Sequence, residues 1–135
     1  MHCEVGEMPA RVMDLMSYPV LTVPPNAKVI DAIRLMASGP KGCVIIAEGG
    51  ILKEVKGIVT TSRIFTKVFA AGLDPERVCV AEIMTPAPLV TISPDATTRE
   101  AAELMVRRNI RRLPVVQEGA LVGIITSKDL LRCVK

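Results

Sequence analysis

One sequence pattern occurs twice in the chain, over residues 12–68 and 80–134. Each copy begins with a short apolar segment ending in Met, continues through Thr, Pro and Ala into an amphipathic stretch, and closes on Gly-x-x-Thr. A unit of this size is too small to bury its own apolar face, so the two copies must pack together. The repeat predicts a paired architecture, with the seam between the copies as the natural place for a ligand.

The two copies align block by block. The segment Thr22–Ala27 corresponds to Thr91–Ala96, and Gly57–Thr60 corresponds to Gly123–Thr126. The largest difference is a longer hairpin tip in the first copy, at residues 48–56, which a loop can absorb. We assign residues 1–11 to an N-terminal extension, 12–69 to the first motif, 70–79 to a linker and 80–135 to the second motif.

Hydrophobic spacing predicts the same elements in both copies. Apolar residues recur at helical spacing from Val29 to Met36, and Gly39-Pro40 follows as a stop signal. In the second copy, Thr97 and Glu100 have the spacing of a helix-starting capping box. Runs rich in branched residues predict a hairpin and then a closing helix in each copy. Each motif is thus predicted to be an α/β (α+β) unit ordered β-α-β-β-α, and we expect both amphipathic helices to pack on one sheet.

Composition narrows the class of protein. The chain has 135 residues and is 50% apolar, but no apolar run approaches the roughly 18 residues that cross a bilayer. No signal-peptide pattern opens it, so we expect a cytoplasmic protein without a membrane partner. The apolar content favours a face buried against a second copy, that is, a homodimer. The net charge is only +3 and the few aromatic residues are not set among basic ones, which disfavours nucleic-acid binding.

Metal and catalytic chemistry have little support in the sequence. The 4 cysteines are far apart, and the single histidine, His2, lies near the start of the chain, so a zinc site is disfavoured. Cys43 and Cys133 lie in apolar segments, where a reduced thiol packs as a small hydrophobe, although disulfides stay open. No nucleophile and base can be paired from one histidine, so we predict no enzyme activity and no cofactor.

The segment Gly123–Asp129 is the most informative short motif. A strand is predicted to end at Thr126 and a helix to begin at once, so the Thr hydroxyl and the amides of Ser127 and Lys128 suit an anion. Asp129 in the first turn can accept both hydroxyls of a ribose. The alternative is structural, with Thr126 as N-cap and Asp129 as its capping-box partner. A lysine in the first turn of a helix, such as Lys128, is unfavourable beside the positive end of the dipole unless an anion is near. Its position therefore favours a phosphate role.

The repeated unit resembles the CBS domain, a family whose paired motifs bind adenine nucleotides through a G-h-x-T/S-x-x-D segment, here Gly123 to Asp129. The resemblance covers most of the chain. It implies that the two motifs pack as a pseudo-twofold pair, a Bateman module, with two clefts that each mix residues of both motifs. The implied function is a regulatory sensor of AMP, ADP or ATP that signals to a regulated protein or across its own dimer. The sequence ranks none of these ligands above S-adenosylmethionine.

The resemblance also implies one intact and one altered cleft. Residues of the intact cleft would be Thr22, Ala27, Gly42, Cys43, Val44, Thr126, Lys128 and Asp129. Residues of the altered cleft would be Thr91, Ala96, Arg111, Arg112, Leu113, Thr60, Ser62 and Arg63. Arg63 stands where the family has Asp and would present a cation, which cannot accept hydrogen bonds from ribose hydroxyls. We therefore expect two unequal sites.

Residues 107–112 form the densest charge cluster in the chain. Arg107 and Arg108 suit the C-terminal end of a helix, where cations complement the dipole. Arg111 and Arg112 precede the buried strand, where the family often places phosphate-contacting residues, and guanidinium groups suit phosphate geometry. For these two, the structural and the functional interpretation stay equally open. The alternative function is a protein-interaction or oligomerisation scaffold with vestigial clefts, which Arg63 favours.

Overall fold

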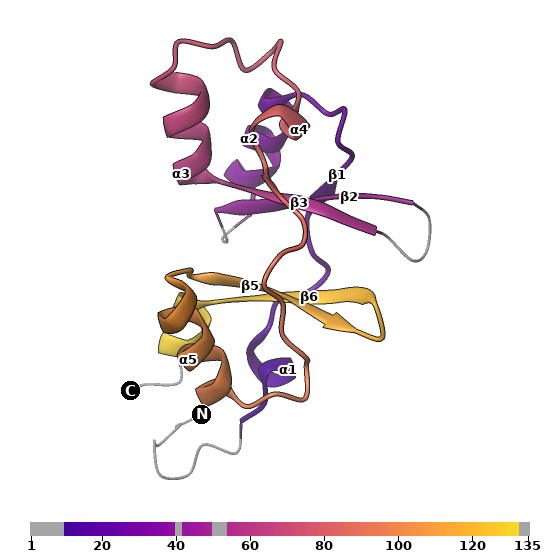
Figure 1. Ribbon diagram of the computed structural model, residues 1–135, viewed down its shortest axis with the longest axis vertical. Helices are drawn as coiled ribbons and strands as arrows, with labels where there is room; N and C mark the ends of the chain where they lie inside the picture. The colour runs from indigo at the N-terminus through magenta and orange to yellow at the C-terminus, as the bar shows by residue number, and fades with distance from the viewer. Residues whose placement is uncertain (1–9, 40–41, 50–53, 133–135) are drawn as a thin grey trace. The chain divides into compact units, whose positions relative to one another are not determined.

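The computed structural model describes residues 10–39, 42–49 and 54–132, which form both helices and strands (Figure 1). The elements are α1 (Val12–Leu15), β1 (Thr22–Val23), α2 (Val29–Ala37), β2 (Cys43–Glu48), β3 (Glu54–Thr60), α3 (Thr61–Ile64), the π-helical η2 (Phe65–Phe69), α4 (Val80–Ile83), β4 (Thr85–Pro86), α5 (Thr98–Arg108), β5 (Arg112–Gln117), β6 (Ala120–Thr126) and α6 (Ser127–Leu131). The predicted α/β class, both hairpins and both amphipathic helices are confirmed.

The chain divides into two compact units that differ from the repeats in one respect. Among the described residues, unit 1 contains 10–20 and 90–132, and unit 2 contains 21–39, 42–49 and 54–89. The short helix that opens each motif therefore lies in the unit built mainly by the other motif. Helix α1 contacts β6 in unit 1, and α4 contacts β3 in unit 2 (Figure 1). The chain passes from one unit to the other after Val20 and again after Leu89.

Unit 2 is built on a four-stranded sheet in the order β1-β2-β3-β4. Strand β1 runs parallel to β2, whereas β3 is antiparallel to both β2 and β4. Helix α2 contacts β2 and fully buries Val29 and Ala32, which lie about one helical turn apart on its apolar face. The core residues of unit 2 are Val23, Val29, Ala32, Val44, Ile46, Val59, Ile64, Val68, Val80 and Ile83.

Unit 1 is built on the antiparallel pair β5-β6. Single bridges extend this pair: Ile92 is parallel to Val115, and Ser17 is antiparallel to Ile124. Helix α5 contacts β5, so the prediction that both amphipathic helices pack on one sheet is wrong. Each hairpin contacts the helix of its own motif, α2 on β2 and α5 on β5, so the two helices pack on two different sheets. The core residues are Val12, Ala101, Met105, Leu113, Val115 and Ile125.

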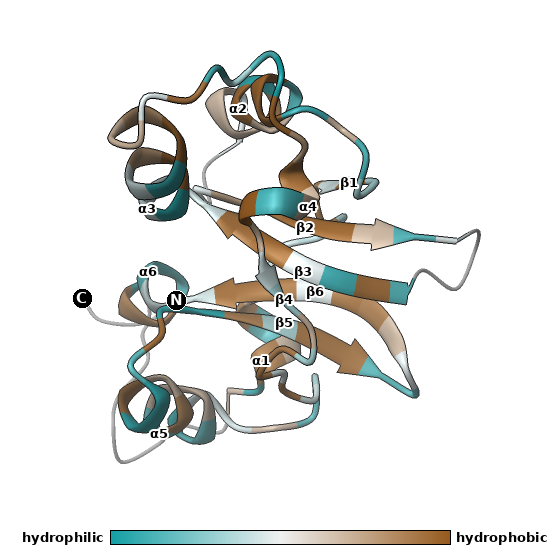
Figure 2. Cartoon of the chain, turned by 45° about the horizontal axis from the view of Figure 1, so that its top comes forward, coloured by the Kyte–Doolittle hydropathy of each residue, from teal (hydrophilic) through white to brown (hydrophobic). Residues whose placement is uncertain are grey.

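The hydropathy of the residues differs between the strands and the hairpin tip. The strands are mainly apolar, whereas the tip of the β5-β6 hairpin is hydrophilic (Figure 2). Burying a Val, Leu or Ile side chain stabilises a fold by about 1.5–3 kcal/mol, so the strands and the helices packed on them both contribute to the stability of each unit. Among the helices in the described ranges, none combines the length and the apolar composition that a bilayer crossing needs.

Helix α5 begins at the predicted capping box. The Thr97 hydroxyl accepts from the Glu100 amide at 3.0 Å, and the Glu100 carboxylate accepts from the Thr97 amide at 2.9 Å. The hydrogen bond from the Thr97 backbone is the main reason why the pKa of Glu100 lies below its usual value. The helix ends at Asn109, which adopts a left-handed conformation with φ 54°, and Arg107 and Arg108 occupy the last turn as predicted.

The glycine of each Gly-x-x-Thr segment lets the chain pass closely over the sheet. A Cβ on Gly57 would lie 2.5 Å from the Thr85 carbonyl oxygen and 2.6 Å from a Met84 side-chain atom. A Cβ on Gly123 would lie 2.6 Å from the Met16 sulfur. The segment that follows α4 or α1 therefore rests on strand backbone that has no side chain. This contact explains why both copies carry glycine at the same position.

Candidate functional site

In unit 1, the candidate site lies where β6 ends and α6 begins. Thr126 is paired with Arg112 across the hairpin, and the Ser127 amide donates to the Arg111 carbonyl at 2.9 Å. These contacts place the entry of β5 beside the start of α6. Leu113 is buried, whereas the side chains of Arg111 and Lys128 are exposed.

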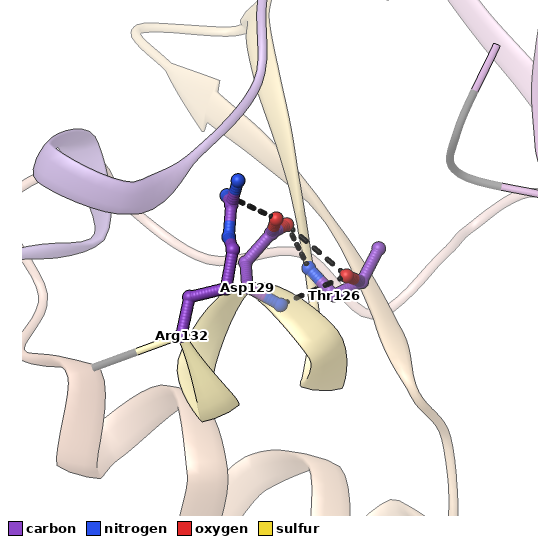
Figure 3. A network of polar contacts seen from close by, with 3 residues as sticks. All are labelled: Thr126, Asp129 and Arg132. Carbon is purple, nitrogen blue, oxygen red and sulfur yellow. Dashed lines mark hydrogen bonds and ion pairs between the residues drawn. The ribbon is translucent and has the colours of Figure 1, made fainter. Parts of the chain in front are cut away.

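Thr126, Asp129 and Arg132 form a polar network at this point (Figure 3). The Asp129 carboxylate is 1% exposed, and its Oδ2 accepts from the Thr126 amide at 2.8 Å and from the Thr126 hydroxyl at 3.1 Å. The Asp129 amide donates to the same hydroxyl at 3.3 Å. The structural interpretation of this pair as a capping box is confirmed, and the ribose role of Asp129 stays a prediction.

Arg132 was not among the residues predicted from the sequence. Its guanidinium Nη2 donates to Asp129 Oδ1 at 2.6 Å, which makes a charge-assisted hydrogen bond and an ion pair. The signal was present in the sequence, because a basic residue three positions after an acidic one lies on the same helix face. It was hidden because such pairs are common on exposed helices.

In unit 2, the same position holds Arg63, which has a structural role that the sequence prediction did not include. Its amide donates to the Thr60 hydroxyl at 3.2 Å, so Thr60 caps α3 as Thr126 caps α6. The half-buried guanidinium donates to the carbonyls of Ile83 at 2.6 Å and Met84 at 3.4 Å. A cation suits these carbonyls, because they carry the negative end of the dipole of α4. A carboxylate at position 63 could not make these contacts.

The other predicted residues of unit 2 lie around the start of β2. Thr22 on β1 is paired with Ile45, and the Thr61 amide donates to the Gly42 carbonyl at 3.0 Å. Cys43 and Val44 are buried, which confirms that Cys43 packs as a core residue, and Cys133 lies outside the described residues.

Four further residues complete the predicted set. Ala27 accepts a backbone hydrogen bond from Val80 at 2.8 Å, and Ala96 accepts the equivalent bond from Val12 at 2.8 Å. Both alanines therefore anchor the exchanged short helices. Thr91 is exposed immediately before the Ile92 bridge, and Ser62 is exposed in the first turn of α3.

The two units divide the predicted site residues evenly. Unit 2 holds Thr22, Ala27, Gly42, Cys43, Val44, Thr60, Ser62 and Arg63. Unit 1 holds Thr91, Ala96, Arg111, Arg112, Leu113, Thr126, Lys128 and Asp129. Each predicted cleft draws on both units, so the composition of the clefts stays a prediction. Over the described part of the chain, no group of three or more His, Cys, Asp or Glu residues could hold a metal ion.

The repeated geometry corresponds to a known family. The family model of the CBS domain matches residues 12–70 and 80–135. The chain belongs to the CBS-domain family. The two matches confirm the tandem CBS pair predicted from the repeat.

Relatives and solved structures of CBS proteins extend this finding. CBS domain-containing protein YhcV of Bacillus subtilis is 36% identical over 119 residues, which cover 88% of this CBS pair and 81% of YhcV. The chain spans only 19% and 20% of the length of two Arabidopsis thaliana relatives. A hexameric CBS-CP12 protein from bloom-forming cyanobacteria has a TM-score of 0.80 at 35% identity, covering 90% of this chain and 69% of that one.

A further CBS-pair structure contains ligands. The CBS domain pair of protein MJ0100, in complex with 5′-methylthioadenosine and S-adenosyl-L-methionine, has a TM-score of 0.79 at 27% identity. The match covers 91% of this chain and 94% of that one. Both ligands of MJ0100 contain an adenosine group, so a ribose is part of what that pair binds.

Proposed function

We propose that this CBS pair is a regulatory module that binds an adenine nucleotide, AMP, ADP or ATP, without catalysing a reaction. CBS-domain proteins are generally regulatory modules, and the name of the relative YhcV refers to no enzyme activity. The observation that carries the proposal is the Thr126–Asp129 pair, in which two hydrogen bonds hold a buried carboxylate in one orientation at the end of β6. A carboxylate held in this way suits the paired hydroxyls of a ribose.

Capping and ribose binding are compatible in Asp129. A carboxylate has about four acceptor positions on two oxygens; the capping box uses Oδ2, and Arg132 takes a position on Oδ1. The orientation that caps α6 therefore does not exclude a sugar from the same side chain. Arg63 has no acceptor atom on its guanidinium, so we propose one ribose site per chain, at Asp129.

The test compares two capping-box acids at the same helical position. Asp129→Ala should weaken AMP binding by about 1–3 kcal/mol, the loss expected for charged hydrogen bonds. Glu100→Ala removes the equivalent acid from α5, outside the predicted clefts, and should leave the affinity unchanged. Calorimetric titration with AMP, ADP, ATP and S-adenosylmethionine measures both effects, and a ligand that binds only the folded state also raises the Tm.

Two outcomes contradict parts of the proposal. Equal AMP affinity of the wild type and Asp129→Ala would remove Asp129 from the ribose role. No binding of any of the four ligands at millimolar concentration would leave the second candidate, an interaction scaffold with vestigial clefts. The structural role of Arg63 favours that candidate for one of the two clefts.

Self-association is the second part of the proposal. Phe65 and Phe69 on η2 are 58% and 49% exposed, and Leu73 follows at 46%. Exposed apolar side chains grouped on one segment are typical of interaction surfaces, and the CBS-CP12 neighbour is hexameric. We therefore propose a homodimer that transmits ligand binding to a regulated protein. Sedimentation at several concentrations tests this, and a monomer at all of them would contradict it.

A further inference from the structure

The ion pair of Arg132 involves the carboxylate oxygen that the capping box does not use. Oδ2 of Asp129 accepts both bonds from Thr126, whereas Oδ1 accepts from Arg132 at 2.6 Å. The two partners differ in accessibility, since the Arg132 side chain is 64% exposed and the Asp129 side chain is 1% exposed. An exposed cation is therefore paired with a carboxylate that the backbone holds in place.

We propose that Arg132 is an intramolecular competitor for the ribose-binding carboxylate, a latch that a ligand must displace from Asp129 Oδ1. This inference rests on the ribose role proposed for Asp129. Ribose hydroxyls would donate to the carboxylate, and the guanidinium already donates to Oδ1. Two ribose hydroxyls need two acceptor positions, whereas Thr126 uses Oδ2 twice and Arg132 uses Oδ1. A sugar that binds through both hydroxyls therefore displaces the guanidinium, and the affinity for a nucleoside is lowered by the stability of the ion pair.

The latch discriminates between ligands by their charge. A displaced guanidinium pairs readily with phosphate, whose oxygens match its planar fork of donors. A phosphorylated nucleoside therefore offers Arg132 a replacement partner. An uncharged nucleoside offers no such partner, so its binding affinity is reduced by the whole free energy of the broken ion pair. Arg132 would thus make this CBS pair selective for phosphorylated over uncharged adenosine ligands.

The chain contains a matched control for this arrangement. In α2, Asp31 occupies the same helical position as Asp129, and its carboxylate accepts from the Lys28 amide at 3.1 Å. Arg34 follows three residues later with Nη1 at 3.9 Å from Asp31 Oδ1. The side chain of Asp31 is 51% exposed, and neither Asp31 nor Arg34 belongs to a predicted cleft. Arg34→Gln therefore removes an ion pair of the same spacing, longer and more exposed than that of Arg132, at a place where no ligand is expected.

The experiment titrates the full chain with 5′-methylthioadenosine, an uncharged ligand, and with AMP. Arg132→Gln should lower the Kd for 5′-methylthioadenosine about two- to fivefold, the range expected when a partly exposed ion pair is removed. The same variant should gain less for AMP, because the phosphate loses a partner. Arg34→Gln should match the wild type for both ligands. The Arg132 side chain is largely exposed, so the variant should fold, and a thermal melt checks this.

The outcomes separate the latch from the proposed function. If the wild type binds AMP but Arg132→Gln binds 5′-methylthioadenosine no more tightly than the wild type, the latch is wrong and nucleotide binding stands. Absence of 5′-methylthioadenosine binding in both proteins, with AMP bound, contradicts the latch in the same way. If Asp129→Ala binds AMP like the wild type, the ribose role fails and the latch fails with it.

Discussion

At the residue level, one position of the repeat holds opposite charges in the two copies, and the two side chains make different contacts. Asp129 caps α6 through the Thr126 amide, whereas Arg63 binds the carbonyls at the end of α4. The sequence predicted the difference in charge and its effect on ribose binding. It could not predict the contact of Arg63, because Ile83 is 20 residues away and no spacing rule connects the two.

Thr98 provides a test at the same scale. Its side chain is 1% exposed, and its hydroxyl has no hydrogen-bond partner among the described residues. The corresponding residue of the first copy is Val29, which is fully buried. Thr98→Val should therefore stabilise the protein by about 1 kcal/mol in urea unfolding, because an unsatisfied buried hydroxyl is removed.

The neighbouring threonine is the control for this measurement. Thr97 caps α5, so Thr97→Val should destabilise the protein by about 1 kcal/mol. A loss of stability in Thr98→Val as well would show that the Thr98 hydroxyl has a partner and that the structural argument is wrong.

At the level of elements, local signals were sufficient for the hairpins and the amphipathic helices. The capping box at Thr97 and the helix α2 follow from residues within a few positions of one another. The bridge at Ser17 and the strand β4 were not predicted, because each pairs with a strand far away in the sequence. Their positions depend on the close approach at Gly123 and Gly57.

This close approach predicts the effect of two substitutions. Gly57→Ala and Gly123→Ala should each destabilise the protein by about 1–3 kcal/mol, because the new methyl group would meet backbone or sulfur atoms at 2.5–2.6 Å. Gly39→Ala is the control. Its nearest neighbour would be the flexible end of the Leu21 side chain, at 2.9 Å from the new Cβ, which can move away. Urea unfolding compares the three variants. Equal losses would show that the contact with the crossing segment is not the cause.

At the level of the whole molecule, the repeat and the packed units differ by the exchange of α1 and α4. Val12 of the first copy is completely buried in the core of unit 1, and Val80 of the second copy is completely buried in the core of unit 2. Each motif therefore depends on a short segment of the other for its core. This gives a physical basis for the prediction that neither copy is stable alone.

Amide hydrogen exchange can test this exchange of helices. Val12→Ala should destabilise the protein by about 2 kcal/mol through the cavity that it leaves. In this variant, the rates of amide hydrogen exchange should rise first in α5, β5 and β6. Val80→Ala should raise them first in α2, β2 and β3. If Val12→Ala instead increased exchange in β2 and β3, α1 would belong with its own motif and the division into units would be wrong.

The sequence alone determined the repeat, the hairpins, the caps of α5 and α6 and, through the repeated unit with its Gly123–Asp129 segment, the resemblance to the family. These features depend on residues that are close in the chain, where spacing translates directly into geometry. Only the tertiary structure decided where α1 and α4 pack, what Arg63 binds and which of the possible helix-surface pairs joins Arg132 to Asp129. The physical reason is that burial and long-range backbone pairing depend on segments that meet only after folding, and such meetings leave no periodicity in the sequence.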